Sequence, residues 1–197
     1  LRTPVVASLV VPRKVDDYLE LFDPTWSVEH VRARVVKLRS TTRRAHSLWL
    51  QPNELWRGFL AGQYVLVTVR SDGVRYTRCF SMSSAPADRL PLRITIQSVA
   101  DGRVSDWVSR VVQPGDVVEL SQAQGDFVLP EVLPRELLFM SGGSGITPLL
   151  SMLRQLCHVQ HSATVHFVHY TRDEFMFGEE IAALAVSHPW LRVILHN

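Results

Sequence analysis

The sequence has few cysteines and no long apolar run. Its two cysteines, Cys79 and Cys157, lie far apart and in no metal-ligand spacing, which argues against a disulfide framework, a zinc site or an in-chain iron–sulfur cluster. Such cysteine usage is typical of a reducing cytosol, so we expect a cytoplasmic protein that binds no metal. The apolar run at residues 5–11 is too short to span a bilayer and lacks the flanks of a signal peptide.

The chain also lacks a strong net charge. Its 21 Lys and Arg against 19 Asp and Glu leave a net charge of +2, with a pI near 8.8, which is too weak to predict nucleic-acid binding. The one local excess is at residues 32–44, which hold six basic side chains and no acid. Such a run is usually a solvated face. A docking patch for an acidic partner protein is the alternative.

Two patterns of secondary structure follow each other along the 197 residues and predict two domains. A lead-in over residues 1–30 holds a short predicted helix at 16–22. Residues 31–132 then alternate apolar and polar positions between turns, which predicts an antiparallel barrel or sandwich with strands at 31–35, 47–50, 64–69, 74–80, 92–98 and 117–120. One helix interrupts this run, with Ser105 as its predicted N-cap and an apolar face formed by Trp107, Val108, Val111 and Val112.

From residue 133 to residue 197 the rhythm changes to strand, helix, strand, helix, strand. The expected elements are at 137–140, 149–157, 164–170, 179–186 and 191–195. This order predicts a βαβαβ unit with a parallel sheet. The first strand is continuously apolar, so we expect it to be buried on both faces of that sheet.

A glycine-rich turn joins the first strand of this unit to its first helix. It reads Gly142, Gly143, Ser144, Gly145, Ile146, Thr147, Pro148. Glycines let the backbone approach a ligand closely, and Thr147 and Pro148 are predicted to be the cap and the first residue of the helix. A helix N-terminus at the carboxyl end of a strand is a ready anion site. An ordinary βα turn is the plainer interpretation, since the spacing matches neither a G-x-G-x-x-G fingerprint nor a P-loop.

The residues after the predicted strand at 164–170 indicate which dinucleotide a Rossmann-like fold would bind, because the adenosine ribose is recognised at the end of the second strand of such a fold. Thr171 and Arg172 can hold a 2′-phosphate, which favours NADPH. Asp173 and Glu174 can instead bond a free 2′-hydroxyl, as NADH would require. We favour NADPH.

A second candidate segment, Arg78-Cys79-Phe80-Ser81, ends a predicted barrel strand. Strand alternation presents Arg78 and Phe80 on one face. A guanidinium binds a pyrophosphate well, an aromatic ring stacks on a planar heterocycle, and Ser81 suits a ring nitrogen. Taken alone, these four residues would also fit a routine strand end.

Four motifs, in order, resemble the ferredoxin–NADP reductase-like superfamily. Residues 78–81 resemble its R-x-Y/F-S/T motif, residues 62–64 its G-Q-Y/F step, residues 102–105 its G-x-x-S flavin-phosphate helix start, and residues 142–148 its G-G-x-G-I-T-P nicotinamide loop. The resemblance covers residues 31–197 and is strongest to bacterial reductases that supply desaturases and oxygenases. It implies two domains, an antiparallel Greek-key β-barrel that binds FAD and a Rossmann-like α/β nucleotide domain.

The resemblance also implies a role for each matching residue. Phe80 would stack on the isoalloxazine and Arg78 would bind the FAD pyrophosphate together with the amides of Val104 and Ser105. Ser81 would hydrogen-bond flavin N5 and Thr147 would lie where nicotinamide meets flavin, so these two are the predicted catalytic residues. The other predicted cofactor-binding residues are Tyr64, Cys79, Ile96, Gln97, Ser98, Gly102, Arg103, Gly142, Gly143, Ser144, Gly145, Ile146, Thr171 and Arg172.

The implied function is a flavoprotein reductase. It would take hydride from NADPH, or NADH, onto FAD and pass single electrons to an acidic iron–sulfur or haem partner, such as a ferredoxin, an oxygenase or a desaturase. A 2Fe-2S cluster would belong to the partner or to a missing domain, because the chain lacks the C-x4-C-x2-C ligands. It also stops at Asn197 without the family's later Cys-Gly-Pro-type loop, so we expect an incomplete nucleotide domain. A flavin-binding electron-transfer subunit without NAD(P)H activity is the alternative, and a docking module without FAD is another.

Overall fold

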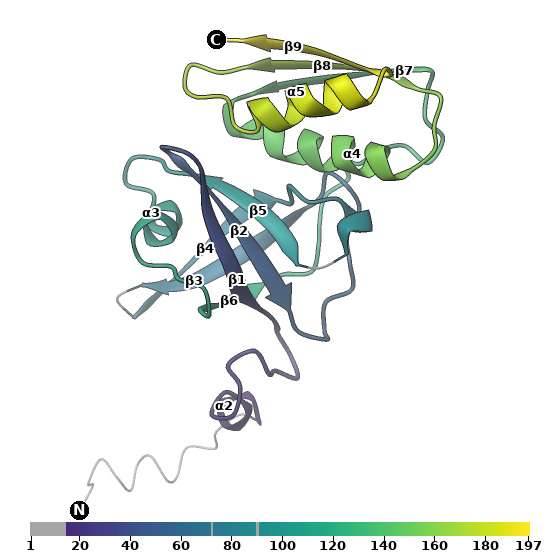
Figure 1. The fold of residues 1–197 in the computed structure, drawn as a ribbon. Helices are drawn as coiled ribbons and strands as arrows, with labels where there is room; N and C mark the ends of the chain where they lie inside the picture. The colour runs from purple at the N-terminus through teal and green to yellow at the C-terminus, as the bar shows by residue number, and fades with distance from the viewer. Residues whose placement is uncertain (1–14, 72, 90) are drawn as a thin grey trace, which may run out of the picture.

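The computed structural model describes residues 15–71, 73–89 and 91–197. The part of the predicted lead-in before residue 15, with the apolar run at 5–11, lies outside these ranges. Beyond the lead-in the chain forms a β-barrel and then a three-stranded α/β unit that sits on one side of the barrel (Figure 1). The predicted two-domain fold is confirmed.

Six antiparallel strands build the barrel. They are arranged in the order β4-β3-β6-β1-β2-β5. An isolated antiparallel bridge joins Met82, just after β4, to Ile94 of β5, so the two edge strands meet and the sheet closes. Their bounds are β1 (Val31–Thr42), β2 (Ala45–Pro52), β3 (Tyr64–Ser71), β4 (Val74–Ser81), β5 (Leu92–Gln97) and β6 (Val117–Leu120).

The barrel core is made by alternate side chains of its strands, as the period of two in the sequence predicts. In β3 the side chains of Val65, Val67 and Val69 are buried, and the residues between them are half-buried. Helix α3 (Arg103–Arg110) adds Val104 and Val108 to the same core. The barrel therefore places its polar side chains outward, where a ligand can reach them.

The start of α3 differs from the prediction. The helix begins at Arg103, and Gly102 is its N-cap. Ser105 lies inside the first turn, where its hydroxyl donates to the Gly102 carbonyl at 3.0 Å and accepts from the Val99 amide at 3.3 Å. The predicted apolar face is narrower than expected, because Val111 is exposed.

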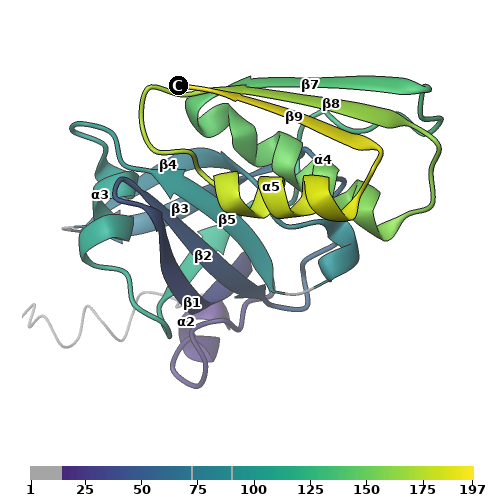
Figure 2. The same cartoon turned by 45° about the horizontal axis from the view of Figure 1, so that its top comes forward.

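The α/β unit follows the predicted order of elements. It consists of β7 (Glu136–Gly142), α4 (Ile146–His158), β8 (Thr164–Tyr170), α5 (Gly178–Ser187) and β9 (Leu191–His196). The three strands are parallel, in the order β7-β8-β9. Both helices lie on the same face of this sheet, between the sheet and the barrel (Figures 1 and 2).

Because both helices lie on one face of the sheet, the expectation that the first strand of this unit is buried on both faces is wrong. In the described chain the other face of the sheet is open, so Leu138 and Met140 of β7 are 63% and 62% exposed. Phe139, on the helix side, is buried and packs edge-on against Phe167 with ring centroids 6.2 Å apart. The apolar strand is thus covered on one face of the sheet only.

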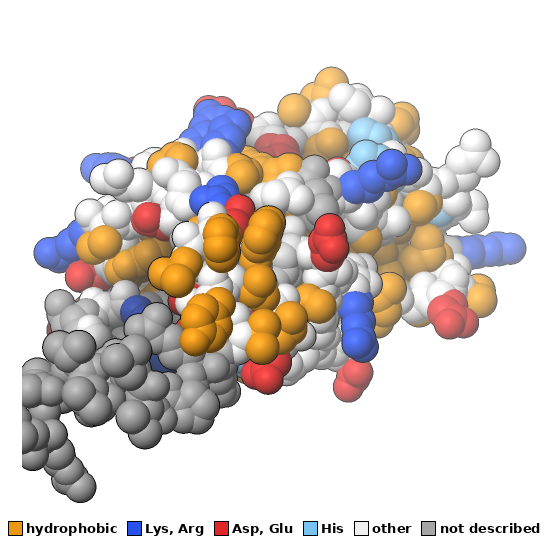
Figure 3. Space-filling model, turned by 90° about the horizontal axis from the view of Figure 1, so that it is seen from below, with side chains coloured by type: hydrophobic (Ala, Val, Ile, Leu, Met, Phe, Trp, Pro, Cys, Tyr) orange, Lys and Arg blue, Asp and Glu red, His pale blue; other side chains and the backbone are white. Residues whose placement is uncertain are grey.

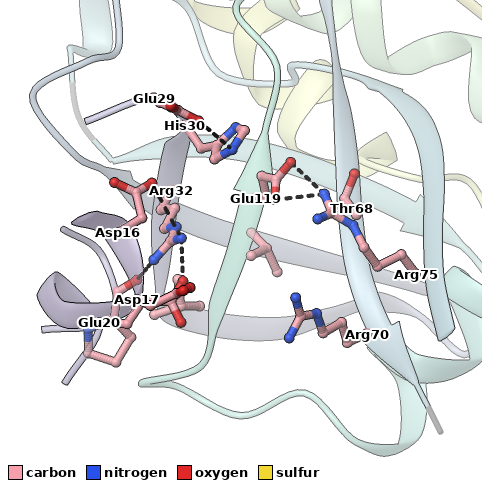
Figure 4. A pocket seen from close by; sticks show the side chains of 13 residues that line it. Asp16, Asp17, Glu20, Glu29, His30, Arg32, Thr68, Arg70, Arg75 and Glu119 are labelled. Atoms are coloured by element: carbon pink, nitrogen blue, oxygen red, sulfur yellow. Dashed lines mark hydrogen bonds and ion pairs between the residues drawn. The ribbon is translucent and has the colours of Figure 1, made fainter. Parts of the chain in front are cut away.

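The lead-in is tied to the barrel through Arg32. Its side chain is only 11% exposed and forms ion pairs with Asp16, at 3.8 Å, and with Glu20 (Figure 4). Arg32 also donates to the carbonyls of Pro24 and Trp26 at 3.2 and 3.3 Å. Helix α2 (Val15–Leu19), which is shorter than predicted, is held to β1 in this way.

The basic run at residues 32–44 is largely paired within the chain. Besides Arg32, Arg34 bonds to Asp23 at 2.8 Å, and Arg43 and Arg44 pair with acidic residues of the α/β unit. The ammonium of Lys37 lies 4.8 Å from the centre of the Trp49 ring. Most of the charge of this run is therefore used inside the chain rather than offered to a partner.

Large hydrophobic side chains are exposed along the lead-in. Hydrophobic side chains gather on the face seen from below in Figure 3, the side of the barrel on which α2 lies. None of the helices in the described part of the chain has the length and apolar character that crossing a bilayer requires. The exposed side chains of the lead-in are Val15, Tyr18, Leu21, Phe22, Trp26 and Val28.

Gly62 of the G-Q-Y motif offers a stability test. Its φ is +104°, and a Cβ there would overlap the Phe127 carbonyl oxygen and the end of the Met152 side chain. Gly58 is the matched control, because its φ is +87° but a Cβ would meet nothing within 4 Å. We expect Gly58→Ala to lower the free energy of unfolding by about 1–2 kcal/mol through backbone strain, and Gly62→Ala by about 1–3 kcal/mol more through overpacking. Urea unfolding measures both, and equal losses would contradict the close approach.

Candidate flavin and nucleotide site

A cavity of about 440 Å³ lies where the barrel meets the α/β unit. The end of β4, the end of β5 and the start of α3 line it from the barrel, and the start of α4 lines it from the other side. The structure therefore brings the two candidate segments of the sequence into one cavity. The predicted site residues that line it are Arg78, Cys79, Phe80, Ser81, Gln97, Gly102, Arg103, Val104, Ser105, Ser144, Gly145 and Thr147.

The end of β4 presents an unneutralised guanidinium and an aromatic ring. Arg78 is exposed and donates to the Thr77 carbonyl at 2.7 Å. No carboxylate among the described residues pairs with it. Phe80 is half-buried with one side against the barrel core. The Ser81 hydroxyl has no hydrogen-bond partner within the described chain, so all three side chains retain the capacity to contact a ligand.

Helix α3 directs its N-terminus into the cavity. Its first backbone N–H groups, at Arg103, Val104 and Ser105, have no partner within the helix, and no side chain caps them. A Cβ on Gly102 would overlap the side chains of Ser105 and Val99, so only glycine fits at this N-cap. The helix terminus and the guanidinium of Arg103 together favour an anion.

The residue at which α4 begins differs from the prediction. The helix begins at Ile146 after the N-cap Gly145, so Thr147 and Pro148 are its second and third residues rather than its cap and first. The Thr147 hydroxyl donates to the Ser144 carbonyl at 3.0 Å, the Ile146 amide donates to the carbonyls of Gly143 and Ser144, and no side chain caps the helix. Gly143 has φ +52°, a conformation that glycine adopts without strain.

Strand alternation corrects the prediction for β5. Ile96 is 1% exposed and belongs to the barrel core, while Thr95 and Gln97 face the cavity. Ser98 does not line the cavity, but Val99 does. Side chains at i and i+2 share a face, so the alternation of apolar Ile94 and Ile96 with polar Thr95 and Gln97 was the signal that would have found Thr95. Pro148 was also missed as a lining residue.

Several other predicted residues lie outside this cavity. Tyr64 pairs with Ser81 across β3 and β4, but its ring packs beside Gly125. Ile146 is fully buried in the core of the α/β unit. Gly142 and Gly143 form the turn that precedes the lining residues Ser144 and Gly145 without lining the cavity themselves.

Thr171 and Arg172 line a second cavity of about 470 Å³, which shares Gln97 with the first. The turn between β1 and β2 forms its opposite wall. Glu174 accepts hydrogen bonds from the Arg43 amide, at 2.9 Å, and from the Arg43 guanidinium. These bonds, the amide first, hold the pKa of the Glu174 carboxyl below its usual range.

The second acid of this loop is engaged in the same way. Asp173 pairs with Arg44 at 3.6 Å. Both carboxylates that could bond a free ribose 2′-hydroxyl thus face arginines of the barrel. Arg172, which has no carboxylate partner in the described chain, is left as the uncompensated charge at the end of β8.

The donors around the first cavity suit a ligand that combines a flat ring with phosphates. Phe80 supplies the ring surface, and Arg78, Arg103 and the α3 terminus supply positive charge. FAD has this combination, so the residues present fit it. Among the described residues no three His, Cys, Asp or Glu side chains form a group able to hold a metal ion.

Two family models match the chain. The oxidoreductase FAD-binding domain matches residues 34–129, and the oxidoreductase NAD-binding domain matches residues 139–196. The chain is 36% identical over 197 residues to an NADPH oxidoreductase of Mycobacterium tuberculosis, covering 96% of this chain and 51% of that protein. It is 30% identical over 172 residues to a glycine betaine monooxygenase reductase subunit of Chromohalobacter salexigens, covering 86% and 47%. The chain thus spans about half the length of these relatives.

Solved structures share the fold. The FAD/NAD-binding domain of a Vibrio cholerae nitric oxide dioxygenase superposes with a TM-score of 0.76 at 25% identity, covering 84% of this chain and 73% of that one. An Amycolatopsis cytochrome P450 reductase gives 0.75 at 27% identity, covering 86% and 53%. The chain therefore belongs to the ferredoxin–NADP reductase-like superfamily, with an FAD-binding domain followed by an NAD-binding domain.

Proposed function

We propose that the protein is an FAD-dependent NADPH oxidoreductase that passes electrons to an iron–sulfur or haem acceptor. One observation carries the proposal: the flavin motif at residues 78–81 and the start of α4 line the same cavity. A reductase needs such an arrangement, because the nicotinamide must reach the flavin. An electron-transfer subunit without its own NADPH activity would not need the glycine loop at this cavity.

The barrel residues hold and orient the cofactor in this proposal. Arg78 and the α3 N-terminus bind the pyrophosphate, Phe80 covers one face of the isoalloxazine, and Ser81 donates a hydrogen bond to its N5 edge. Bound FAD supplies the hydride acceptor and the capacity to release electrons one at a time. The chain's own task is to bind, orient and exclude water around that ring.

The α/β unit binds the dinucleotide. The N-terminus of α4, which no side chain caps, attracts its pyrophosphate through the helix dipole. Thr147 borders the nicotinamide, with its hydroxyl already held by the Ser144 carbonyl. The catalytic residues we assign are therefore Ser81 on the flavin side and Thr147 on the nicotinamide side.

The choice of NADPH rests on Arg172. Asp173 and Glu174 are engaged by Arg44 and Arg43, so they are poorly placed to accept a bond from a ribose hydroxyl. Arg172 and Thr171 in the adjoining cavity suit a 2′-phosphate. The related NADPH oxidoreductase of Mycobacterium tuberculosis supports the same choice.

The acceptor is proposed from the relatives. One is the reductase subunit of a monooxygenase and another is a cytochrome P450 reductase, so we infer a protein or domain that carries iron, with any 2Fe-2S cluster in that partner. Cys79 and Cys157 are unpaired, as is typical of the cytoplasm, where we place the protein.

The proposal is tested by the visible spectrum of the intact protein. We expect flavin absorbance after addition of FAD and its bleaching by NADPH without oxygen. Flavin bands that NADPH does not bleach would favour the electron-transfer subunit. If the protein binds no flavin at all, both the reductase and the electron-transfer subunit are excluded.

Arg78→Ala tests whether the flavin motif at residues 78–81 binds FAD. Loss of a charge-assisted hydrogen bond costs about 1.5–3 kcal/mol, so the dissociation constant for FAD should rise by about 10- to 150-fold. Arg75→Ala is the control, because Arg75 is on the same strand but pairs with Glu119 at 2.8 and 2.9 Å. Fluorescence titration with FAD measures both variants. Unchanged FAD affinity in Arg78→Ala would show that the motif is misplaced.

Arg172→Ala tests coenzyme choice. We expect kcat/KM for NADPH to fall by about 10- to 100-fold, as loss of a bond to a charged phosphate predicts. The value for NADH should change little, since NADH has no 2′-phosphate to lose. Steady-state reduction of an artificial acceptor gives both values. A wild-type preference for NADH would refute the assignment.

A further inference from the structure

One face of α4 bonds to the segment that follows the flavin motif. Ser151, Arg154, Gln155 and His158 share this face at helical spacing, and we call them the α4 stripe. The Ser151 hydroxyl donates to the Ser84 carbonyl at 2.6 Å, and Arg154 donates to the Ser83 carbonyl. The Ala87 amide donates to Gln155 at 3.1 Å, and His158 lies 2.9 Å from Asp88.

Arg154 is the centre of this junction. Its side chain is 11% exposed. Besides the Ser83 carbonyl, it bonds both carboxylate oxygens of Glu180 on α5, with Nε–Oε1 and Nη2–Oε2 distances of 2.7 Å. Arg154 is therefore paired with a carboxylate and also bonded to a backbone carbonyl, as a buried guanidinium requires. Arg154 thus joins α4, α5 and the barrel at one point.

The Phe177 ring completes the junction. The guanidinium carbons of Arg93 and Arg154 lie 4.7 and 5.6 Å from its centre. Arg93 extends from β5 and lies 3.8 Å from Glu180. Burial, followed by the nearby charge of Arg154, lowers the pKa of Arg93 to about 10. Phe177 has φ +62° and is buried, so the surrounding contacts hold it in a conformation that is costly for a bulky residue.

Both sides of the junction continue directly into the cofactor cavity. Ser83 is two residues after Ser81 of the flavin motif. Ser151 is four residues, about one helical turn, after Thr147 at the start of α4. The bonds of Ser151 and Arg154 to the Ser84 and Ser83 carbonyls therefore set how far the glycine loop lies from the flavin motif.

We propose that Arg154 is a positioning residue for hydride transfer, which holds the glycine loop in register with the flavin motif by bonding Ser83 and Glu180 together. This inference rests on the proposed function. Arg154 touches neither cofactor in this proposal and acts through the placement of α4. A misplacement of about 1 Å is enough to slow a reaction about 100-fold.

The test uses Arg154→Met in the intact, FAD-loaded protein. We expect flavin reduction at saturating NADPH to slow by about tenfold or more, with FAD affinity within about twofold of wild type. Amide hydrogen exchange should accelerate at residues 83–88 and 143–147 and stay unchanged in β3. Arg154→Lys should recover part of the rate, because it restores one donor but not the bidentate pair.

Two further variants serve as a control and as a replacement if the first variant does not fold. His158→Ala, at the 48% exposed end of the stripe, should reduce its flavin within about twofold of the wild-type rate. If Arg154→Met does not fold, Arg154→Met/Glu180→Met replaces it, because it leaves no half-buried carboxylate without its bidentate arginine.

The outcomes are distinguishable. If NADPH does not reduce the FAD of the wild-type protein, the proposed function is overturned. Hydrogen exchange at residues 83–88 and 143–147 in Arg154→Met would then still test whether Arg154 holds the junction. A rate and an exchange pattern equal to wild type in Arg154→Met would overturn the positioning role. Slow reduction with unchanged exchange at residues 143–147 would also overturn it, since the loop would not have moved.

Discussion

The bonds of Arg154 to Ser83 and Glu180 join both helices of the α/β unit to the barrel two residues beyond the flavin motif, and in our proposal they hold the two domains in register. The cavity exists only because the α/β unit lies against the barrel at this angle. Each motif is complete within its own domain, yet neither encloses a ligand alone. Arginine suits this place because its planar fork can serve one carbonyl and one carboxylate together. In this proposal a short polar stripe on α4 sets the spacing of residues that lie far apart in the sequence.

Ion pairs of arginine side chains also decide which charges remain unpaired on the described surface. Arg32 and Arg34 hold the lead-in, and Arg43 and Arg44 engage the acids that follow β8. Most of these pairs are exposed, so each contributes little stability. Their larger effect is on the electrostatics of the cavities. They neutralise Asp173 and Glu174, and they leave Arg78, Arg103 and Arg172 facing the cavities without carboxylate partners in the described chain.

Much of the fold and site was predictable because the relevant signals are local. Alternation located the barrel strands, and β8 matches its predicted range. The ordered motifs at residues 62–64, 78–81, 102–105 and 142–148 identified the family. Several errors were made where two local options compete. Ser105 and Thr147 have the chemistry of caps, but each hydroxyl bonds a preceding carbonyl inside its helix. Ile96 was assigned to the site although its strand position directs it into the core.

The sequence by itself determined the family and the two candidate segments, since glycine turns, helix starts and strand ends are encoded within a few residues. Only the tertiary structure decided that both segments line one cavity, that the acids after β8 face arginines of the barrel, and that Leu138 and Met140 of β7 are exposed in the described part of the chain. These outcomes depend on pairings across the domain junction, such as Arg43 with Glu174 and Arg154 with Ser83. Residues so far apart leave no local pattern, because side-chain periodicity records only the face on which a residue lies and not the partner that covers it.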